Sequence, residues 1–367
     1  MNPKLKKSLV FFILLLTSAF TYTAISDGGS TETQVFYQLN GERAKDSLVL
    51  EHPSDGVDQI VFSPDGRYIA SRMFSLPGDA TTYIWNVNTR QCVKFLGSEG
   101  SPKSLAFSPD GKYLAVGIAK TFNQVTQNDV CIVFFDVETG EKINKLRRTV
   151  PANYNISPVE DIAFSPDGKY LAAGTGHGEG VIEVWSIGSG TLVKALTGVK
   201  GHIRNLSYSP DGKYIAVSNY SSSIHVWDIG TGRLYKTFTT DEGSINFLTY
   251  SPDGQYIALA FNKEIGKTGE HQGTIEIWDV TKGKRIKNIT SESPNHLIRT
   301  LAYSPDGKYI ASGGYEGVVR LWDSATGAQI KVFDNQPNKF ISSIVFSPDG
   351  KYMASGCGKY IKVWKYN

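Results

Sequence analysis

The chain has 367 residues, of which 12% are aromatic, 20% are charged and 37 are glycine. This composition is typical of a globular β protein with many turns and argues against a disordered or mainly helical chain. The formal net charge of +3 belongs to Lys4, Lys6 and Lys7, because residues 27–367 hold 35 basic and 35 acidic side chains. This balance leaves no overall positive charge to attract a polyanion, so we expect no nucleic-acid partner.

The first 26 residues have the features of an export signal. The three lysines precede an uncharged apolar run from Leu9 to Phe20, and small residues follow up to Ser26. An apolar core of about 12 residues is within the signal-peptide range and shorter than the roughly 20 residues of a comfortable membrane-spanning helix. We therefore predict a signal peptide over residues 1–26, cleaved after Ser26. An uncleaved membrane anchor is the alternative, and it would be the only membrane connection. Both predictions place the body outside the cytoplasm, in a periplasmic, extracellular or outward-facing anchored form.

A tetrapeptide repeat organises the rest of the chain. Ser-Pro-Asp-Gly occurs seven times, at intervals of 42 to 57 residues, with an aromatic residue on each side. Pro presets the first corner of a type I turn, Asp suits the second, and Gly accepts the left-handed conformation that returns the chain. Each copy is therefore predicted to close a β-hairpin. The copies begin at Ser63, Ser108, Ser165, Ser209, Ser251, Ser304 and Ser347.

Two further strand-like segments follow each predicted hairpin, except that the last repeat has only the first of them. This third segment contains a tryptophan in six repeats and Phe135 in the second repeat. The fourth segment begins after a turn residue that is Arg90 in the first repeat and glycine in the next five. The repeat unit is thus predicted to be a four-stranded antiparallel meander. The tryptophans are Trp85, Trp185, Trp227, Trp278, Trp322 and Trp364.

These residues resemble the WD-repeat family. The Trp-Asp dipeptide that names the family begins at Trp227, Trp278 and Trp322, and Gly201-His202 stands where its Gly-His pair is expected. The resemblance covers residues 46–367 and implies an all-β, seven-bladed β-propeller of four-stranded antiparallel blades. The other repeats have no Gly-His pair at this position and most lack the aspartate before the tryptophan strand, with Glu316 as one substitute. We therefore expect a divergent member with an incomplete side-chain hydrogen-bond network.

The two ends of the repeat region predict how the ring closes. The last repeat stops after its third strand, whereas Ser47 to Glu51 precedes the first hairpin at the distance of a fourth strand. We expect this segment to complete the last blade, which hides sheet edges that would otherwise be free to pair. Residues 27–45 are predicted to be a linker or a short extra strand.

Loop lengths indicate which face of the propeller binds partners. The Ser-Pro-Asp-Gly turns and the turns after the tryptophan strands keep their lengths and share one face, here called the constant face. On the opposite, variable face, the distance from the turn serine to the tryptophan or its equivalent is 18 residues in the fourth and sixth repeats but 27 in the second and fifth. Binding residues often occupy such loops, so we predict that this face binds protein partners, although the insertions can also simply pack on their own blades. The predicted partner-binding residues are Phe122, Arg147, Arg148 and Tyr154 near the second blade, and Tyr220 and Tyr315 in short turns.

The sequence contains no recognisable catalytic or metal-binding motif. The six histidines follow no metal-ligand spacing, and Cys92, Cys131 and Cys357 allow at most one disulfide. We therefore predict no catalytic residue, no metal and no cofactor, and the family resemblance implies a non-enzymatic scaffold for protein partners. The alternative is an exported hydrolase or lyase acting on a carbohydrate or other small molecule in the central channel. Its candidate residues are His177, Glu264, His271 and His296.

Overall fold

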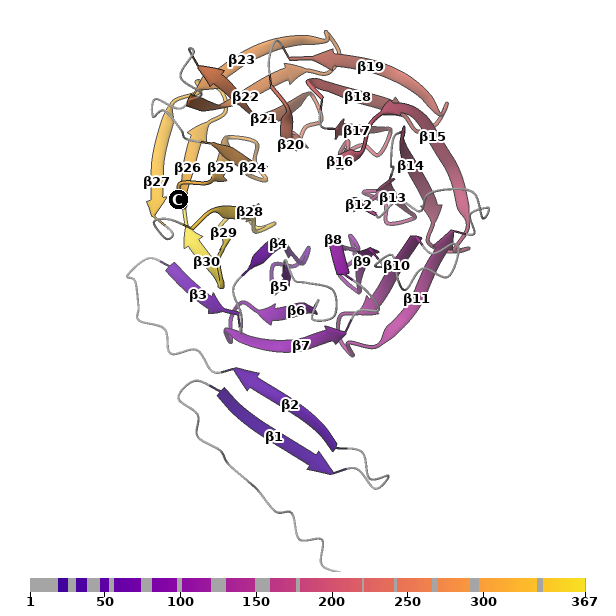
Figure 1. Ribbon diagram of the computed structural model, residues 1–367, viewed down its shortest axis with the longest axis vertical. Coiled ribbons are helices and arrows are strands. Elements are labelled where there is room, and N and C mark those ends of the chain that lie inside the picture. Colours follow the sequence, from indigo (N-terminus) through magenta and orange to yellow (C-terminus); the bar gives the residue numbers. More distant parts are fainter. Residues whose placement is uncertain are drawn as a thin grey trace, which may run out of the picture.

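Seven β-sheets form the blades of a disc around a common axis (Figure 1). A computed structural model describes residues 19–25, 31–37, 47–52, 56–73, 81–97, 101–119, 130–148, 159–175, 179–219, 221–240, 243–265, 270–290, 297–334 and 339–366. Within these ranges all regular elements are strands, and each blade is a four-stranded antiparallel sheet. The predicted seven-bladed, all-β architecture is therefore confirmed.

The strands of a blade run outward from the axis in sequence order, except in the seventh blade. The innermost strand precedes the Ser-Pro-Asp-Gly turn, the third carries the tryptophan or Phe135, and the fourth forms the rim. The first three blades contain β4 (Val57–Phe62), β5 (Tyr68–Met73), β6 (Thr81–Asn86) and β7 (Gln91–Gly97); β8 (Ser101–Phe107), β9 (Tyr113–Ala119), β10 (Val130–Asp136) and β11 (Lys142–Arg148); and β12 (Asp161–Phe164), β13 (Tyr170–Thr175), β14 (Glu179–Ser186) and β15 (Leu192–Lys200). The next three contain β16 (Ile203–Tyr208), β17 (Tyr214–Asn219), β18 (Ser223–Asp228) and β19 (Arg233–Thr239); β20 (Ile245–Tyr250), β21 (Tyr256–Ile265), β22 (Glu270–Asp279) and β23 (Lys284–Thr290); and β24 (Ile298–Tyr303), β25 (Tyr309–Gly314), β26 (Val318–Asp323) and β27 (Gln329–Asp334).

The seventh blade joins the two ends of the repeat region. It contains β28 (Ile341–Phe346), β29 (Tyr352–Cys357), β30 (Tyr360–Lys365) and, as its outer strand, β3 (Ser47–Glu51). Strand β3 pairs antiparallel with β30, and the pairing continues beyond β3, where the amide of His52 donates a 2.7 Å hydrogen bond to the carbonyl of Lys359. The predicted closing strand is therefore confirmed.

The Ser-Pro-Asp-Gly turns have the same geometry in all seven blades. The glycine amide donates to the serine carbonyl at 2.8 to 2.9 Å, and the glycine φ lies between 68° and 74°. The serine hydroxyl donates to the aspartate at 2.5 to 2.7 Å and accepts the amide of the following tyrosine at 2.9 to 3.0 Å. These bonds give each turn aspartate a structural role within its own turn. The recurrence of the seven aspartates therefore needs no shared carboxylate site to explain it.

The hydrophobic core is divided into clusters that lie between neighbouring blades. The aromatic residue of the third strand packs against the preceding blade: Trp85 is fully buried among residues that include Leu50 and Ile361 of the seventh blade. Phe135 takes the equivalent place between the first and second blades. Because each aromatic side chain is shared by two blades, its burial stabilises the ring rather than a single sheet.

The tryptophan indole nitrogens donate hydrogen bonds in only some blades. The indole nitrogen of Trp85 donates to Ser71 Oγ at 2.9 Å, and His52 Nε2 lies 2.7 Å from the same oxygen. Trp322 and Trp364 also donate to serines, and Trp278 donates to Glu276. Within the described residues the indole nitrogens of Trp185 and Trp227 have no acceptor. The expected incomplete network is thus observed, and His52, which the sequence did not single out, belongs to it.

The insertion in the fifth blade extends two strands and does not form a simple loop. Its extra residues lengthen β21 and β22 to ten residues each, compared with six in β25 and β26, and pair them up to Ile265 and Glu270. The insertion is therefore an extended hairpin. Of the insertion expected in the second blade, residues 120–129 lie outside the described part of the chain.

A separate hairpin precedes the ring. Strand β1 (Ala19–Ile25) pairs antiparallel with β2 (Thr31–Tyr37), and Figure 1 draws both beyond the rim of the disc. Strand β2 falls in the segment that was predicted to be a linker or an extra strand. In the described residues no helix has the length and apolar character needed to cross a membrane. The export signal over residues 1–26 stays a prediction, and residues 1–18 are outside the described part.

Candidate functional site

The structure describes only some of the predicted partner-binding residues. Tyr315 lies in the turn between β25 and β26, and its side chain is 53% exposed on the variable face. Arg147 and Arg148 are the last residues of β11 rather than part of a loop, and their side chains are not described. Phe122, Tyr154 and Tyr220 lie outside the described residues. The predicted meeting of the four residues near the second blade therefore stays a prediction.

Tyr315 forms an exposed aromatic pair with Phe340. Their ring centroids are 6.1 Å apart, and Phe340, which precedes β28, is 42% exposed. The guanidinium of Arg299, near the start of β24, lies 5.2 Å from the centroid of the Phe340 ring, a distance typical of a cation–π contact. Large exposed aromatic side chains beside an arginine are characteristic of protein-binding surfaces. Tyr315 is thus the predicted residue that the structure brings into a candidate site.

A pocket opens beside this aromatic pair. Its volume is about 430 Å³, which lies in the range of small ligand or side-chain pockets. It lies where the sixth, seventh and first blades meet, since its residues come from the starts of β24 and β4, the approach to β28 and the turn between β29 and β30. The lining residues are Gly56, Val57, Asp58, Arg299, Lys339, Phe340 and Gly358.

Asp58 and Arg299, two charged residues of this pocket, lie at β-bulges. The strand register shifts between Val57 and Gln59 in the first blade and between Ile298 and Thr300 in the sixth blade. Asp58 and Arg299 are the extra residues, and a bulge turns the side chain of such a residue away from the regular alternation. The carboxylate of Asp58 then meets Arg299 at 3.1 Å.

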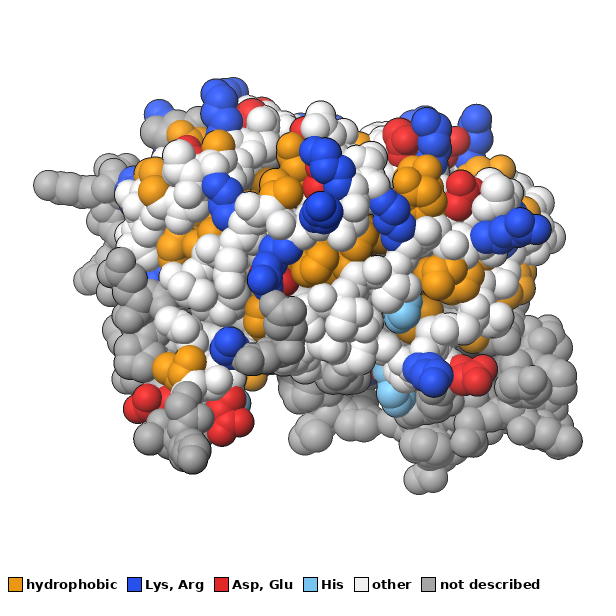
Figure 2. Space-filling view, turned by 90° about the horizontal axis from the view of Figure 1, so that it is seen from above, with side chains coloured by type: hydrophobic (Ala, Val, Ile, Leu, Met, Phe, Trp, Pro, Cys, Tyr) orange, Lys and Arg blue, Asp and Glu red, His pale blue; other side chains and the backbone are white. Residues whose placement is uncertain are grey.

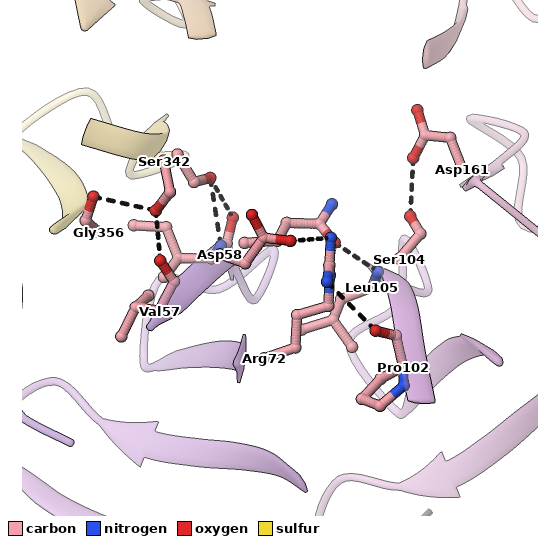
Figure 3. A network of polar contacts seen from close by, with 12 residues as sticks. Val57, Asp58, Arg72, Pro102, Ser104, Leu105, Asp161, Ser342 and Gly356 are labelled. Carbon is pink, nitrogen blue, oxygen red and sulfur yellow. Dashed lines mark hydrogen bonds and ion pairs between the residues drawn. The ribbon is translucent and has the colours of Figure 1, made fainter. Parts of the chain in front are cut away.

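A second arginine holds Asp58 from the other side. Arg72 of β5 contacts the Asp58 carboxylate at 2.6 Å and donates to the carbonyl of Pro102 in the second blade at 3.2 Å (Figure 3). Burial lowers the pKa of Arg72, and the nearby Asp58 carboxylate opposes this shift. Both side chains are largely buried, with exposed fractions of 13% for Arg72 and 11% for Asp58. Such a paired and hydrogen-bonded arrangement fixes the carboxylate in place.

A belt of polar side chains links the inner strands of neighbouring blades. At one position of the inner strand, a polar side chain accepts a hydrogen bond from an amide of the adjacent blade at 2.8 to 3.2 Å. Burial raises the pKa of Asp161, one of these residues, while Leu206, Ser104, Asn205 and Ile162 donate hydrogen bonds that oppose the shift. Figure 3 shows the bond from Ser104 to Asp161. The acceptors are Gln59, Ser104, Asp161, Asn205 and Ser343, and the donors are the amides of Leu105, Ile162, Leu206, Leu248 and Ile60 respectively.

The constant face has a different character. In six of the seven blades the turn aspartate is paired with the lysine or arginine that follows the glycine, as in Asp65 and Arg67. Hydrogen bonds from the turn help to lower the pKa of Asp110. Figure 2 shows such basic and acidic side chains gathered along one edge of the disc. These pairs are exposed, with side-chain exposures of 41% to 74%, so each contributes little to stability.

The structure describes two of the four residues of the alternative enzymatic site. Glu264 and His271 lie opposite each other on the extended hairpin of the fifth blade, and both are exposed. Neither residue lines the pocket described above, and His177 and His296 lie outside the described residues. Among the residues that the structure describes, no group of three or more histidine, cysteine, aspartate or glutamate side chains is placed to hold a metal ion.

Comparison with known protein families agrees with the repeat and the blades. The family model "WD domain, G-beta repeat" matches residues 45–86, 90–120 and 144–186, and the model "Nucleolar protein 10-like, N-terminal domain" matches residues 190–367. Together these matches cover most of the ring, with gaps at residues 87–89, 121–143 and 187–189. The chain is a WD-repeat β-propeller.

Several relatives share these WD repeats. An uncharacterized WD repeat-containing protein of Synechocystis is 29% identical over 326 residues, which cover 88% of this chain and 85% of that protein. The guanine nucleotide-binding protein subunit beta of Oryza sativa subsp. indica is 30% identical over 35% of this chain and 32% of its own length. The serine-threonine kinase receptor-associated protein of Gallus gallus is 26% identical over 43% and 50% respectively. The match therefore spans about a third of the first of these last two relatives and half of the second.

A solved structure has the same fold at low sequence identity. Hydrazine synthase of Kuenenia stuttgartiensis superimposes with a TM-score of 0.70 over 89% of this chain and 99% of that one, at 18% identity. At this identity the likeness establishes the fold alone.

Sequence reasoning missed Phe340, Arg299 and Asp58. Phe340 follows Lys339 in a connection of ordinary length, whereas long insertions are the main sequence signal for binding residues on this face. The sequence signal that could have indicated Phe340 is an aromatic residue next to a lysine, directly before an inner strand. No local signal joins Arg299 to Asp58, because 241 residues separate them in the chain.

Proposed function

We propose that this WD-repeat protein is an exported, non-enzymatic scaffold that binds protein partners through its variable face. The observation that carries the proposal is the exposed pair of Tyr315 and Phe340 beside Arg299 and the pocket. Aromatic and arginine side chains dominate the binding energy of protein interfaces because they bury a large area and also make directed polar contacts. Two of the relatives are named as a subunit and as a receptor-associated protein, which agrees with a role in assemblies.

The first experiment locates the binding face. A photo-crosslinking amino acid is placed at Tyr315 or Phe340 on the variable face, and at Tyr170 or Tyr352 beside the constant-face turns, where both tyrosines are 38% to 40% exposed. After irradiation of cells that make the protein, we expect discrete adducts with other proteins from the first two positions and none from the second two. Adducts from the constant face alone would contradict the proposed binding face.

The second experiment tests export. Support for export comes from the three N-terminal lysines followed by the apolar run up to Phe20. We expect the full chain to be digested by protease added to cells whose outer barriers have been opened but whose cytoplasm is intact. A version lacking residues 1–26 should remain protected. Protection of the full chain in the cytoplasm would show that the export part of the proposal is wrong.

A further inference from the structure

The pocket between the sixth, seventh and first blades contains the guanidinium of Arg299, which is held in one orientation while most of its N–H donors can still bind a ligand. Within the described part of the chain, Arg299 makes one side-chain hydrogen bond, from Nη2 to Asp58, and its ring contact with Phe340. A guanidinium has five N–H donors in one plane, so most of them remain for a ligand. The Arg299 side chain is 32% exposed, which leaves it accessible from the pocket. Its orientation is fixed from two sides before any ligand arrives, which reduces the entropy lost on binding.

The charge of the pocket favours an anionic group. Its lining contains the cations Arg299 and Lys339 and the carboxylate Asp58. Asp58 is largely buried and is shared with a further cation, Arg72, so its negative charge is compensated within the protein. A positively charged ligand would meet two like charges at the pocket, whereas a carboxylate can form paired, charge-assisted hydrogen bonds with the guanidinium.

The shape of the pocket favours a side chain of a polypeptide. Phe340 forms one wall and continues into the exposed ring of Tyr315, while Gly56 and Gly358 contribute no side chain beyond the backbone. A volume of about 430 Å³ accommodates one or two side chains rather than a large cofactor. The aromatic surface next to the cation provides a place for an apolar neighbour of the bound anion.

We infer that this pocket binds a carboxylate side chain of a protein partner, in a segment where Asp or Glu is adjacent to an aromatic or large aliphatic residue. The inference rests on the proposed function and specifies the chemistry of the segment that the variable face recognises. Arg299 pairs with the carboxylate, Lys339 adds positive charge, and Phe340 with Tyr315 packs against the apolar neighbour.

The test uses the full chain and a displayed library of random heptapeptides. We expect selection on the wild-type protein to enrich peptides with Asp or Glu beside an aromatic or large aliphatic residue. The affinity of a synthetic, fluorescently labelled copy of the most enriched peptide is then measured by anisotropy. Arg299→Gln should weaken binding at least about tenfold, as expected for loss of a charge-assisted pair, and replacement of the peptide carboxylate by its amide should do the same.

Matched variants separate recognition from folding. Arg233→Gln removes an exposed arginine at the start of β19, beside the constant face, and should leave the affinity unchanged. Phe340→Leu keeps an apolar side chain and should reduce the affinity only a few fold, while Phe340→Ser should reduce it about tenfold. Arg299→Lys keeps the charge but loses the planar donor set, so we expect an intermediate affinity that falls further as salt rises. Thermal melting of each variant identifies any that do not fold.

The outcomes distinguish this inference from the proposed function. If the library yields no enrichment on wild type relative to the Arg299→Gln protein, or yields basic peptides, the inference is wrong. If enriched peptides bind the variable face with the same affinity in Arg299→Gln and Arg299→Lys, the inference is also wrong but the proposed binding face stands. Failure of the crosslinking experiment at Tyr315 and Phe340 would remove the binding face itself.

Discussion

The ammonium group of Lys194 donates a 2.6 Å hydrogen bond to the carbonyl oxygen of Gly230 in the neighbouring blade. The same arrangement recurs around the rim, where a lysine of the outer strand reaches carbonyl groups in the turn of the next blade. Figure 2 shows basic side chains among apolar ones on the rim. Lysines on edge strands also discourage pairing with other chains. These lysines therefore both connect neighbouring blades and protect the outer edges of the sheets. The equivalent pairs are Lys94 with Thr139, Lys236 with Val280 and Thr281, and Lys287 with Ala325.

Replacing one of these lysines is expected to weaken the contact between blades. Lys194→Met keeps most of the apolar side chain but removes the donor to Gly230, so we predict a loss of about 1 kcal/mol in the free energy of unfolding. Urea denaturation followed by tryptophan fluorescence measures this change. Lys200→Met, at an exposed position of the same strand, is the control and should change the free energy by less than about 0.5 kcal/mol. Equal effects of the two substitutions would contradict a role for the Lys194 hydrogen bond.

Arg90 occupies a backbone conformation that glycine takes in five other blades. Its φ is 62°, and its amide donates to the carbonyl of Asn86 at 2.8 Å, as Gly140 does to Asp136. A side chain in this left-handed region is strained by about 1 kcal/mol or more. Arg90→Gly removes this strain but makes the unfolded chain more flexible, which partly offsets the gain. We therefore predict that it raises the free energy of unfolding by up to about 1 kcal/mol.

The reciprocal substitution provides the comparison for Arg90. Gly140→Arg places a side chain at φ 76° and should lower the free energy of unfolding by about 1 kcal/mol or more. Both values come from urea denaturation under the same conditions. A destabilised Arg90→Gly protein would show that the arginine side chain makes a compensating contribution.

His52 makes the stability depend on pH. Burial lowers its pKa from 6.5 to about 3, so the unfolded chain binds a proton between these pH values and the folded protein does not. Stability is therefore retained above pH 6.5 and lost as the pH falls below it. Between neutral pH and pH 5 the loss due to His52 is about 2 kcal/mol by proton linkage.

The variant His52→Gln isolates this effect. It retains a polar side chain near Ser71 but has no proton to gain, so its unfolding free energy should change less than that of wild type between pH 7 and pH 5. His225, whose pKa burial also lowers, and the turn aspartates titrate in both proteins and cancel in the difference. Urea denaturation across this range provides the measurement. Parallel pH profiles would contradict the assignment of a neutral, buried His52.

Asn205 connects three blades through the polar belt. Its side chain donates to Asp161 at 2.8 Å in the third blade and accepts the amide of Leu248 at 2.9 Å in the fifth. Asn205→Leu leaves that buried amide without its acceptor, so we predict a loss of about 2 to 3 kcal/mol in the free energy of unfolding. Phe247 holds the equivalent position in the fifth blade, and Phe247→Leu should cost less than about 1.5 kcal/mol. Similar losses for both would argue that packing, rather than hydrogen bonding, decides this position.

Much of the fold was predictable because its signals are local. The backbone preferences of proline and glycine and the serine–aspartate hydrogen bond operate within five residues, so each Ser-Pro-Asp-Gly turn could be recognised alone. Seven copies then defined the blades, and the short final repeat required a strand such as β3. The extended hairpin of β21 and β22 was not predicted, because a variable insertion has no repeated pattern against which to compare it.

The candidate site was predictable only in part. Tyr315 was found from its place in a variable-face turn, but its partner Phe340 was not, since their contact depends on how the sixth and seventh blades meet. His52 was likewise missed because Ser71 and Trp85 reach it only after the ring closes.

The sequence by itself therefore determined the number of blades, the closing strand and the distinction between a constant and a variable face, because turn chemistry and repeat spacing are properties of short segments. The tertiary structure alone decided that Asp58 meets both Arg72 and Arg299, and that a pocket forms beside them. The contact between Arg299 and Asp58 joins the sixth blade to the first, and its geometry follows from ring closure and two β-bulges rather than from any local preference.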